Sequence, residues 1–190
     1  MAEKSGKKGT LLVVSAPSGA GKTTLCGRLL DRFPDICYSV SYTTRDPRAG
    51  EKDGEDYHFI SREDFLKKLD RAYWAEWALV HDNYYGTSAA FLSDALAGGR
   101  DVLLDIDVQG TLQILERFPE AVTIFVMPPS LEVLGQRLEG RATDSPETIR
   151  KRLRNAVREM AQKNIYRHIV VNDELEKAAG ELIAIVESYR

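Results

Sequence analysis

The sequence has few cysteines, no long apolar run and no basic excess, and each shortage excludes a class of protein. Cys26 and Cys37 are its only cysteines; they are too few for a disulfide framework and lie in apolar segments, so we expect buried thiols in a reducing compartment. No stretch approaches the roughly 18 to 20 consecutive apolar residues of a membrane-spanning helix, and the apolar run 11–14 is too short for a signal sequence. We expect a cytoplasmic protein without a membrane partner.

The charge balance argues against a general nucleic-acid-binding protein. Lysine and arginine together number 26 against 29 acidic residues, a formal net charge of −3, whereas nucleic-acid binders usually carry a basic excess. We therefore expect no nucleic-acid partner. We also expect the three histidines, His58, His81 and His168, to be structural or exposed rather than catalytic. The length of 190 residues, 43% of them hydrophobic, suits one compact unit.

Apolar, β-branched runs alternate with longer helical patterns along the chain. Strands are predicted at 10–15, 102–107, 122–127 and 168–172, and a helical pattern follows each of them. Continuously apolar strands separated by helices are typical of a parallel sheet that is buried on both faces. The predicted fold class is α/β.

Two segments interrupt this alternation. Residues 37–88 are rich in aromatic side chains, include both tryptophans and combine short alternating strands with turn signals, so we expect a small, mostly antiparallel insert. Residues 137–153 are polar, rich in arginine and placed between two helical patterns. Within them, Pro146 is expected in the first turn of a helix.

The stretch SAPSGAGKTT, residues 15–24, matches the phosphate-loop pattern G-x-x-x-x-G-K-[ST] except for its first glycine. A strand, a glycine-containing loop and a helix N-terminus bind an anion through backbone N–H groups. Lys22 is predicted to reach the β- and γ-phosphates and Thr23 to ligate Mg²⁺. The predicted ATP-binding residues of the loop are Ala16, Pro17, Ser18, Gly19, Ala20, Gly21, Lys22, Thr23 and Thr24.

Ala16 stands where the pattern has its first glycine. The residue before a proline is pushed towards extended conformations with negative φ, which alanine adopts as easily as glycine. Pro17 therefore removes the main reason for glycine at position 16. We expect Ala16 to have a negative φ, in the β or polyproline region.

The predicted strand 102–107 ends in two carboxylates, Asp105 and Asp107. Ligands gather at the carboxyl ends of the strands in parallel sheets. Either carboxylate is therefore a candidate to hold Mg²⁺ through its water shell, and we favour Asp105 as the partner of Thr23.

Arg45 and Arg48 lie three residues apart among hydroxyl-bearing side chains. Two guanidinium groups with hydroxyl donors around them suit a phosphate monoester. The hydroxyl groups belong to Ser41, Thr43, Thr44 and Tyr57. The alternative is a pair of ordinary surface arginines neutralised by Asp46, Glu51 and Asp53, and the residues alone leave both possibilities open.

Seven stretches, in order along the chain, resemble the guanylate kinase family: SAPSGAGKTT, SYTTRDPRAGEKDGEDYHF, AEW, NYYGT, LLDIDVQG, RLEGRATD and VVND. They extend from Leu11 to at least Asp173. The resemblance implies a phosphate-loop nucleoside-monophosphate-kinase fold with a parallel core, a GMP-binding insert and a helical lid. The implied core covers 1–36, 89–136 and 158–190, the insert covers 37–88, and the lid covers 137–157.

The resemblance also implies a reaction, in which ATP with Mg²⁺ donates its γ-phosphoryl group to GMP, or to dGMP as a second acceptor. The GMP phosphate would be held by Ser41, Arg45, Arg48, Tyr57 and Tyr85, and the guanine base by Glu76, Thr87 and Asp107. Arg137 and Arg141 of the lid, with Arg152 after them, would approach the triphosphate, and Asn172 the adenine. The implied catalytic residues are Lys22, Arg45, Arg137, Arg141 and Arg152.

Glu76 has a physical reason for its implied role. Guanine presents two adjacent donors, N1–H and the exocyclic amine, and a carboxylate accepts from both while repelling the acceptor N1 of adenine. Two alternatives remain: a guanylate-kinase-like scaffold module that binds partner proteins, and a kinase of the same fold with another acceptor such as AMP, CMP or a sugar phosphate. Lys22, Thr23 and Asp105 are all present, which favours the enzyme over the scaffold module. We expect the protein to be a monomer or a small homo-oligomer.

Overall fold

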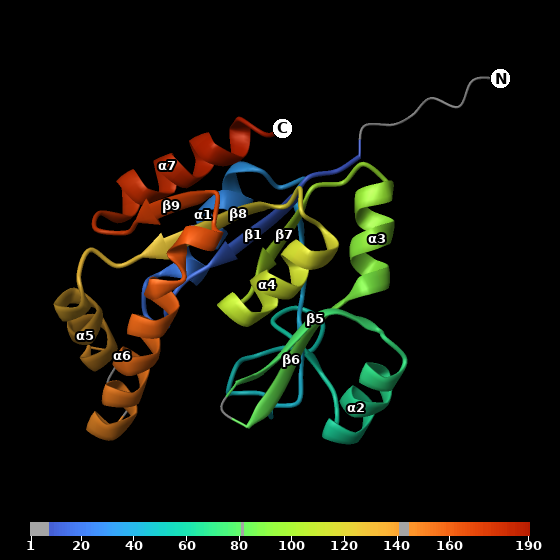
Figure 1. Ribbon diagram of the computed structural model, residues 1–190, viewed down its shortest axis with the longest axis horizontal. Coiled ribbons are helices and arrows are strands. Elements are labelled where there is room, and N and C mark those ends of the chain that lie inside the picture. Colours follow the sequence, from blue (N-terminus) through green and yellow to red (C-terminus); the bar gives the residue numbers. More distant parts are fainter. Residues whose placement is uncertain (1–7, 81, 141–144) are drawn as a thin grey trace. The chain divides into compact units, whose positions relative to one another are not determined.

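The computed structural model describes residues 8–80, 82–140 and 145–190, and its elements carry the labels of Figure 1. The strands are β1 (Leu11–Ser15), β2 (Cys37–Tyr38), β3 (Tyr42–Thr43), β4 (His58–Phe59), β5 (Trp74–Val80), β6 (Asn83–Ser88), β7 (Val102–Asp105), β8 (Val122–Met127) and β9 (His168–Val171). The helices are α1 (Lys22–Arg32), α2 (Arg62–Asp70), α3 (Ala89–Ala97), α4 (Val108–Arg117), α5 (Leu131–Glu139), α6 (Pro146–Ala161), the 3₁₀ helix η1 (Lys163–Ile165) and α7 (Leu175–Glu187).

Within the described residues the strands form two sheets, one of five strands in the order β2-β7-β1-β8-β9 and one of four in the order β4-β3-β6-β5. The pairs β2–β7, β1–β8 and β8–β9 are parallel. The chain divides into two compact units. Unit 1 comprises Met1–Leu11, Ile36–Leu104 and Gln109–Ala121, and unit 2 comprises Leu12–Asp35, Asp105–Val108 and Val122–Arg190.

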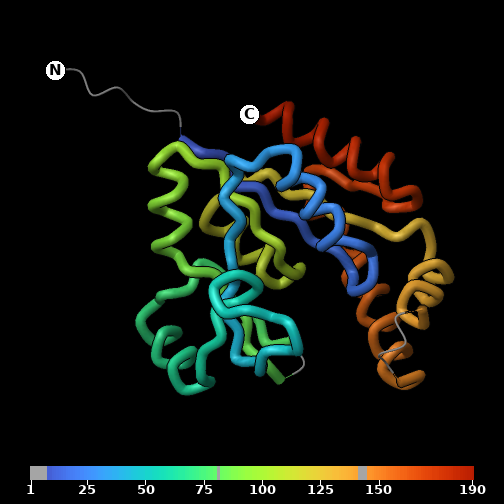
Figure 2. The backbone as a smooth tube through the Cα atoms, turned by 180° about the vertical axis from the view of Figure 1, so that it is seen from behind, coloured from blue at the N-terminus to red at the C-terminus, as the bar shows by residue number. Residues whose placement is uncertain are grey.

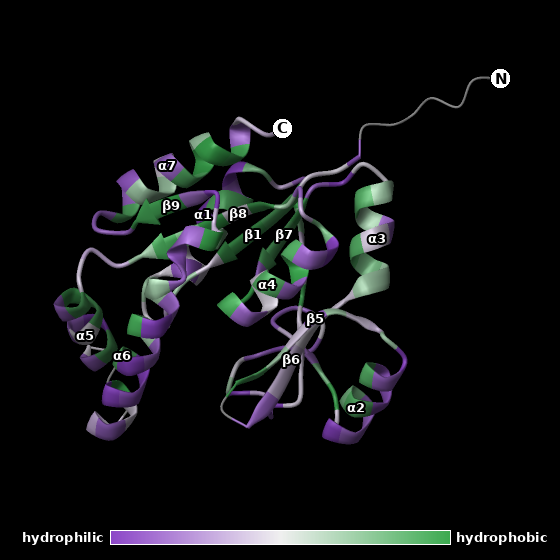
Figure 3. Cartoon of the chain, viewed as in Figure 1, coloured by the Kyte–Doolittle hydropathy of each residue, from purple (hydrophilic) through white to green (hydrophobic). Residues whose placement is uncertain are grey.

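Unit 2 is built on β1, β8 and β9. All five residues of β1 and the first five of β8 are buried, and Figure 3 shows both strands as strongly hydrophobic. Such strands need cover on both faces of the sheet. Helix α7 packs against α1 (Figure 2), and its buried residues are Ala178, Ala179, Leu182 and Val186.

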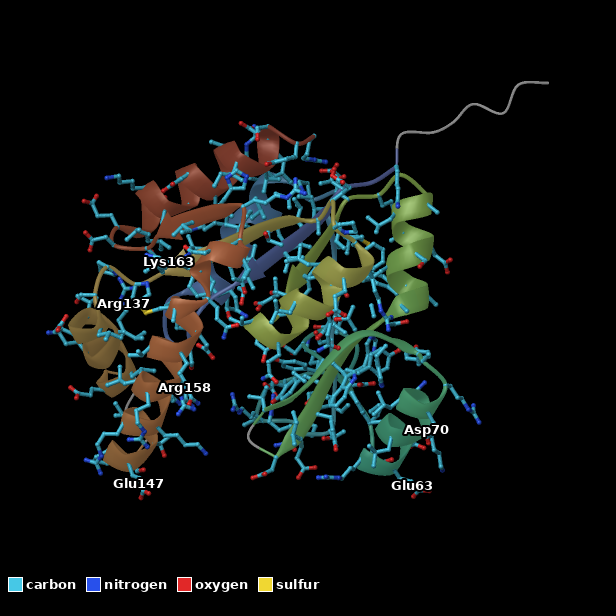
Figure 4. The ribbon with its side chains drawn as sticks, viewed as in Figure 1. Glu63, Asp70, Arg137, Glu147, Arg158 and Lys163 are labelled. Atoms are coloured by element: carbon cyan, nitrogen blue, oxygen red, sulfur yellow. The ribbon has the colours of Figure 1, made fainter. Side chains whose placement is uncertain are left out.

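Helices α5 and α6 form a second cluster within unit 2. Each begins with a serine whose hydroxyl accepts from a backbone N–H of the first turn, Ser130 from Val133 and Ser145 from Thr148. Leu134 and Leu138 of α5 pack against Ala156 of α6. Polar side chains cover their outer surfaces, as Figure 4 shows for α6. Pro146 is the first residue of α6, which confirms its predicted place in the first turn.

Unit 1 contains the β2–β7 pair and the four-stranded sheet. In the latter, β6 is antiparallel to both β3 and β5, while β3 and β4 are parallel, so the mostly antiparallel character predicted for this segment is confirmed. Phe65 of α2 stacks between Trp74 and Tyr84, with ring centroids 4.3 Å and 5.0 Å apart. This aromatic packing is the core of the small sheet.

The predicted parallel α/β core is confirmed, and three local features differ from the predictions. Cys37 and Tyr38 pair in parallel with β7 rather than joining the antiparallel sheet. Helices α2 and α3 were not predicted. Cys26 is buried as predicted, but the prediction for Cys37 is wrong: it is only half-buried, because β2 is the edge strand of its sheet. In the described part of the chain, no helix has the length and apolar character needed to cross a membrane.

Candidate functional site

The loop between β1 and α1 has the backbone of an anion-binding site. Gly19 and Gly21 both have φ of +95°, in the left-handed region that favours glycine. Gly21 is the N-cap of α1, and no side chain in the described residues caps this helix. The first N–H groups of α1 are therefore not taken by a side-chain cap and are oriented to meet an anion.

The φ of Ala16 agrees in sign with the prediction from the sequence. Among the described residues other than glycine, only Ala72 and Asp82 have a positive φ, so the φ of Ala16 is not positive. The expected sign is confirmed, and alanine is accommodated before Pro17.

Lys22, the first residue of α1, contacts the Asp105 carboxylate at the end of β7, and both residues belong to unit 2. Its Nζ forms an ion pair with Asp105 and donates to the carbonyl of Ile106 at 3.2 Å. The two side chains are only 22% and 12% exposed. Burial acts to lower the pKa of Lys22, but Asp105, and more weakly Asp107, hold it above its ordinary value. The ammonium is therefore charged at neutral pH.

Two further titratable groups of unit 2, the Cys26 thiol and the Glu159 carboxyl, interact electrostatically with the residues at this ion pair. Burial raises the pKa of Cys26 to about 12, and Asp105 adds to the shift, so the thiol is a neutral packing group. Burial also raises the pKa of Glu159 on α6, with a contribution from Asp107 and an opposing one from Lys22. Sequence reasoning missed Glu159, since only the packing of α6 brings it to the carboxylates.

Arginines of α5 and α6 reach the phosphate loop and the segment after β9. Arg152 donates to the hydroxyl of Ser18 at 3.0 Å. Arg137, labelled on α5 in Figure 4, donates to the carbonyl of Asn172 at 2.9 Å. Asn172 is buried, and its amide donates to the carbonyl of Ala20 at 2.8 Å. Arg141, also predicted here, lies outside the described residues.

A cavity of about 410 Å³ opens beside the phosphate loop in unit 2. Glycines of the loop, Thr24, Arg137 of α5 and the segment after β9 line it. The lining residues are Gly19, Gly21, Thr24, Arg137, Gly140, Asn172, Asp173 and Leu175. Asn172 thus lines the cavity, although its amide nitrogen is engaged with Ala20.

In unit 1, Glu76 and Thr87 form a buried polar pair. They are directly opposite in the β5–β6 ladder, and the Thr87 hydroxyl donates to Glu76 Oε1 at 2.6 Å. Glu76 is 4% exposed and Thr87 0%. Buried carboxylates are rare without a partner, so this pair marks Glu76 as a residue with a specific task.

Arg45 lies among aromatic rings in the same unit. Its guanidinium is 5.4 Å from the ring centroid of Tyr57, and the Tyr57 and Tyr85 rings are 5.9 Å apart. Arg45 Nη2 binds both oxygens of Glu51, at 2.8 Å and 3.0 Å. Its hydrogen bond to Glu51 raises the pKa of Arg45, and Tyr85 adds to this.

The arginine–carboxylate pairing that the alternative interpretation expected is therefore present for Arg45. It does not use up the guanidinium, which has five N–H donors. Tyr85 and Thr87, two residues apart on β6, lie on one face of the sheet. That face thus carries the buried Glu76–Thr87 pair and, two residues further along β6, the Tyr85 ring, which contacts the Tyr57 ring beside Arg45.

The remaining predicted residues are placed less specifically. Arg48 is exposed, with its backbone N–H bound to Glu51 at 2.7 Å, and Ser41 is half-buried. Asp107 belongs to unit 2, so its predicted role beside Glu76 and Thr87 stays a prediction. The His58 and Tyr42 rings lie 4.5 Å apart and are tilted by 32°, and His168 meets the Tyr189 hydroxyl at 2.8 Å; the structural role of the histidines stays a prediction, and His81 lies outside the described residues.

The oxygen groups near Lys22 suit a magnesium ion that arrives with a nucleotide. Thr23 is exposed in the first turn of α1, and Asp105 is the last residue of β7. In the ranges that the structure describes, no three His, Cys, Asp or Glu residues are grouped to hold a metal. Mg²⁺ usually keeps several waters and binds through one or two protein oxygens plus phosphates, which this arrangement allows.

The phosphate loop is followed by a helix whose first residue is a lysine, and this lysine pairs with a carboxylate at the end of a strand. These features define a nucleoside-triphosphate-binding protein of the phosphate-loop class. Comparison with known proteins narrows this class. The model of the family described as guanylate kinase matches residues 8–189, and the chain belongs to this family.

Individual relatives agree with the family match. The chain is 49% identical to a guanylate kinase of Aromatoleum aromaticum over 182 residues, covering 96% of this chain and 89% of the relative. It is 48% identical to a guanylate kinase of Geobacter metallireducens, with 97% and 91% covered. A crystal structure of guanylate kinase from Anaplasma phagocytophilum matches with a TM-score of 0.79 at 35% identity, covering 96% and 87% of the two chains.

Proposed function

We propose that the protein transfers the γ-phosphoryl group of ATP to GMP, and to dGMP, to give ADP and GDP. The observation that carries the choice of acceptor is the buried Glu76 carboxylate held by the Thr87 hydroxyl. A phosphate loop is common to many nucleotide-binding proteins, whereas a buried carboxylate beside a hydroxyl suits the two adjacent donors of guanine. The enzyme activity agrees with the membership of the guanylate kinase family.

The base would be read by Glu76 and Thr87, with Asp107 as a third contact. Glu76 keeps one oxygen on Thr87 and accepts from N1–H and the exocyclic amine of guanine. Adenine would present an acceptor to the same carboxylate, and the unmet charge would cost about 1–3 kcal/mol or more in a closed site. Discrimination against AMP follows from this repulsion.

The GMP phosphate would bind to the basic and hydroxyl groups of unit 1. Arg45, already oriented by Glu51 and stacked near Tyr57, offers a planar fork that suits phosphate oxygens. Tyr85 lies on the same face of β6 as Thr87, which supports one GMP molecule that contacts Thr87 with its base and Tyr85 with its phosphate. The complete proposed set is Ser41, Arg45, Arg48, Tyr57 and Tyr85.

The triphosphate of ATP would lie on the phosphate loop, residues 16–24. Phosphoryl transfer needs mainly positioning and positive charge against the equatorial oxygens, and needs no general base. Lys22 would supply charge at the β- and γ-phosphates, and the arginines of α5 and α6 would add more. Those arginines are Arg137 and Arg152, with Arg141 from outside the described residues.

The ATP would carry Mg²⁺, with Thr23 as its protein ligand and Asp105, or Asp107, holding its water shell. Bound there, the ion would neutralise charge on the phosphates. The chain's own contribution is to hold the Asp105 carboxylate in an ion pair with Lys22. The nucleoside of ATP would occupy the cavity lined by Arg137 and Asn172.

Other parts of the proposal rest on the family resemblance. The insert 37–88 would close over GMP and the lid 137–157 over ATP, each moving as its substrate binds, since two substrates must meet in line with water excluded. The remaining residues, 1–36, 89–136 and 158–190, would form the core. A cytoplasmic location and a monomer or small homo-oligomer stay predictions.

Replacing Lys22 tests the proposed ATP site. Lys22→Met removes the charge at the transferred phosphate, and we expect kcat for ADP formation from ATP and GMP to fall by at least about a hundredfold. Circular dichroism and a urea titration establish that the variant is folded. Lys177→Met, at an exposed lysine of α7, is the matched control and should keep wild-type turnover.

Near-normal turnover of folded Lys22→Met would refute the ATP-site assignment. Wild-type protein that binds GMP but releases no ADP from ATP and GMP with Mg²⁺ would instead favour the scaffold alternative.

A further inference from the structure

Two side chains of α4 bind the outer edge of strand β5 in unit 1. The Gln113 amide makes a two-way contact with Trp77: its Oε1 accepts from the Trp77 N–H at 3.1 Å, and its Nε2 donates to the Trp77 carbonyl at 2.7 Å. One turn further along α4, Arg117 Nη1 donates to the carbonyl of Trp74 at 2.7 Å. Glu76 lies between these two anchored residues in the chain.

These contacts take the place of a neighbouring strand. Within the described ranges, strand β5 is the last strand of its sheet and pairs with β6 on its other side. An edge residue that points its N–H and C=O outwards normally finds a strand or water there. At Trp77, the Gln113 amide supplies one acceptor and one donor, the same pair that a neighbouring strand would provide.

The anchored stretch is also where β5 departs from regular pairing. The register with β6 shifts between Trp74 and Glu76, so the local backbone is a bulge. A bulge re-aims the side chains that follow it and leaves an extra residue without a ladder partner. On its inner edge this stretch pairs with β6, and on its outer edge Arg117 holds the backbone before the bulge and Gln113 after it, so the direction of Glu76 depends on these outer contacts as well.

We infer that Gln113 and Arg117 are positioning residues for guanine recognition: they fix the backbone on both sides of Glu76 so that its carboxylate meets N1–H and the exocyclic amine together. The inference rests on the proposed function of Glu76. Neither residue touches the base in this scheme. Both act through β5, because a carboxylate that must accept from two donors at once tolerates little rotation.

The test compares GMP with IMP, which lacks the exocyclic amine, using ADP release with saturating ATP and Mg²⁺. Gln113→Met keeps the side-chain length and removes both hydrogen bonds to Trp77. We expect KM for GMP to rise about tenfold, with KM for ATP unchanged. The ratio of kcat/KM for GMP over IMP should fall about fivefold towards that of Glu76→Gln, since the loss concerns the second donor.

Three further variants make the result specific. Gln113→Glu keeps the acceptor for the Trp77 N–H but loses the donor for the Trp77 carbonyl. Its ratio of kcat/KM for GMP over IMP should lie between those of wild type and Gln113→Met. This variant also tests the inference if Gln113→Met does not fold. Arg117→Met should lower the GMP to IMP ratio in the same direction. Glu116→Gln, at an exposed residue of α4, should leave the ratio and both KM values unchanged.

The outcomes separate this inference from the function it rests on. Wild-type protein that releases no ADP with GMP would overturn the proposed function. An active wild type whose ratio of GMP to IMP stays within about twofold in Gln113→Met and Arg117→Met would overturn the inference, even if both variants unfold at a lower temperature. Lower thermal stability with an unchanged ratio is the signature of a merely structural contact.

Discussion

At the scale of single residues, the phosphate loop depends on what lies behind it as much as on its own glycines. Gly21 has φ of +95°, and a Cβ added there would collide with Nδ2 of Asn172. That amide is the group that donates to the Ala20 carbonyl. The left-handed glycine and the buried asparagine therefore form one unit, although 150 residues of sequence separate them.

Gly21→Ala should harm both stability and nucleotide binding. A non-glycine residue in this backbone region costs about 1–3 kcal/mol, and displacement of Asn172 leaves the Ala20 carbonyl without its amide donor. We expect the free energy of unfolding to fall by about that amount and the Kd for ATP to rise at least about tenfold, measured by urea titration and calorimetry.

Gly27→Ala is the matched control for this change. Gly27 lies within α1, and a Cβ there would meet no atom within 4 Å. Because alanine is favoured over glycine in a helix by roughly 0.5–1 kcal/mol, stability should rise slightly with ATP binding unchanged. Equal effects at the two glycines would contradict the proposed link to Asn172.

Cys26 should give the stability a measurable pH dependence. Burial raises the pKa of its thiol to about 12 in the folded protein, from an ordinary value of 9.0. Between these values the unfolded state loses the proton while the folded state keeps it, so stability is full below pH 9 and falls as pH rises, by up to about 1.4 kcal/mol per pH unit. Urea titrations at pH 8 and pH 10 should show a smaller fall for Cys26→Ala than for wild type. An identical fall in both proteins would mean that Cys26 ionises freely.

At the scale of elements, helix α7 is held to unit 2 mainly by its apolar face. Leu182 is 0% exposed, whereas the ion pairs from α1, Arg28 with Glu176 and Arg32 with Glu187, join exposed side chains. Exposed pairs contribute between 0 and about 1 kcal/mol, because solvent and salt screen them.

Leu182→Ala should therefore lower the free energy of unfolding by about 2–5 kcal/mol, while Glu176→Gln should change it by less than about 1 kcal/mol. Urea unfolding monitored by circular dichroism measures both changes. A larger loss in Glu176→Gln than in Leu182→Ala would show that the ion pairs dominate the attachment of α7.

The elements also show what a sequence pattern reveals and what it hides. Strands β1, β8 and β9 were predicted to within about one residue, because buried parallel strands are continuous apolar runs between helices. Strand β2 has only two residues, too few for a periodic pattern. Helix α2 buries only Phe65, so its sequence has no apolar stripe to distinguish it from a polar loop.

At the scale of the whole molecule, the contiguous part of the site was predictable and the assembled part was not. The phosphate loop is a short motif, and Glu76 and Thr87 are implied by the family resemblance. By contrast, Glu159 near Lys22 and Gln113 on the edge of β5 act through contacts between segments far apart in the sequence. No motif in the sequence identifies these residues as part of the site, because a glutamate or a glutamine acquires such a role only through the packing of the fold.

The proposed function makes the chain a phosphotransferase selective for guanine nucleotides. It is tested most directly by measuring ADP release from ATP and Mg²⁺ with GMP, dGMP, AMP, CMP and UMP in turn. We expect rapid release with GMP and dGMP and kcat/KM values lower by at least about a hundredfold with the other three. Comparable release with AMP or CMP, or none with GMP, would contradict it.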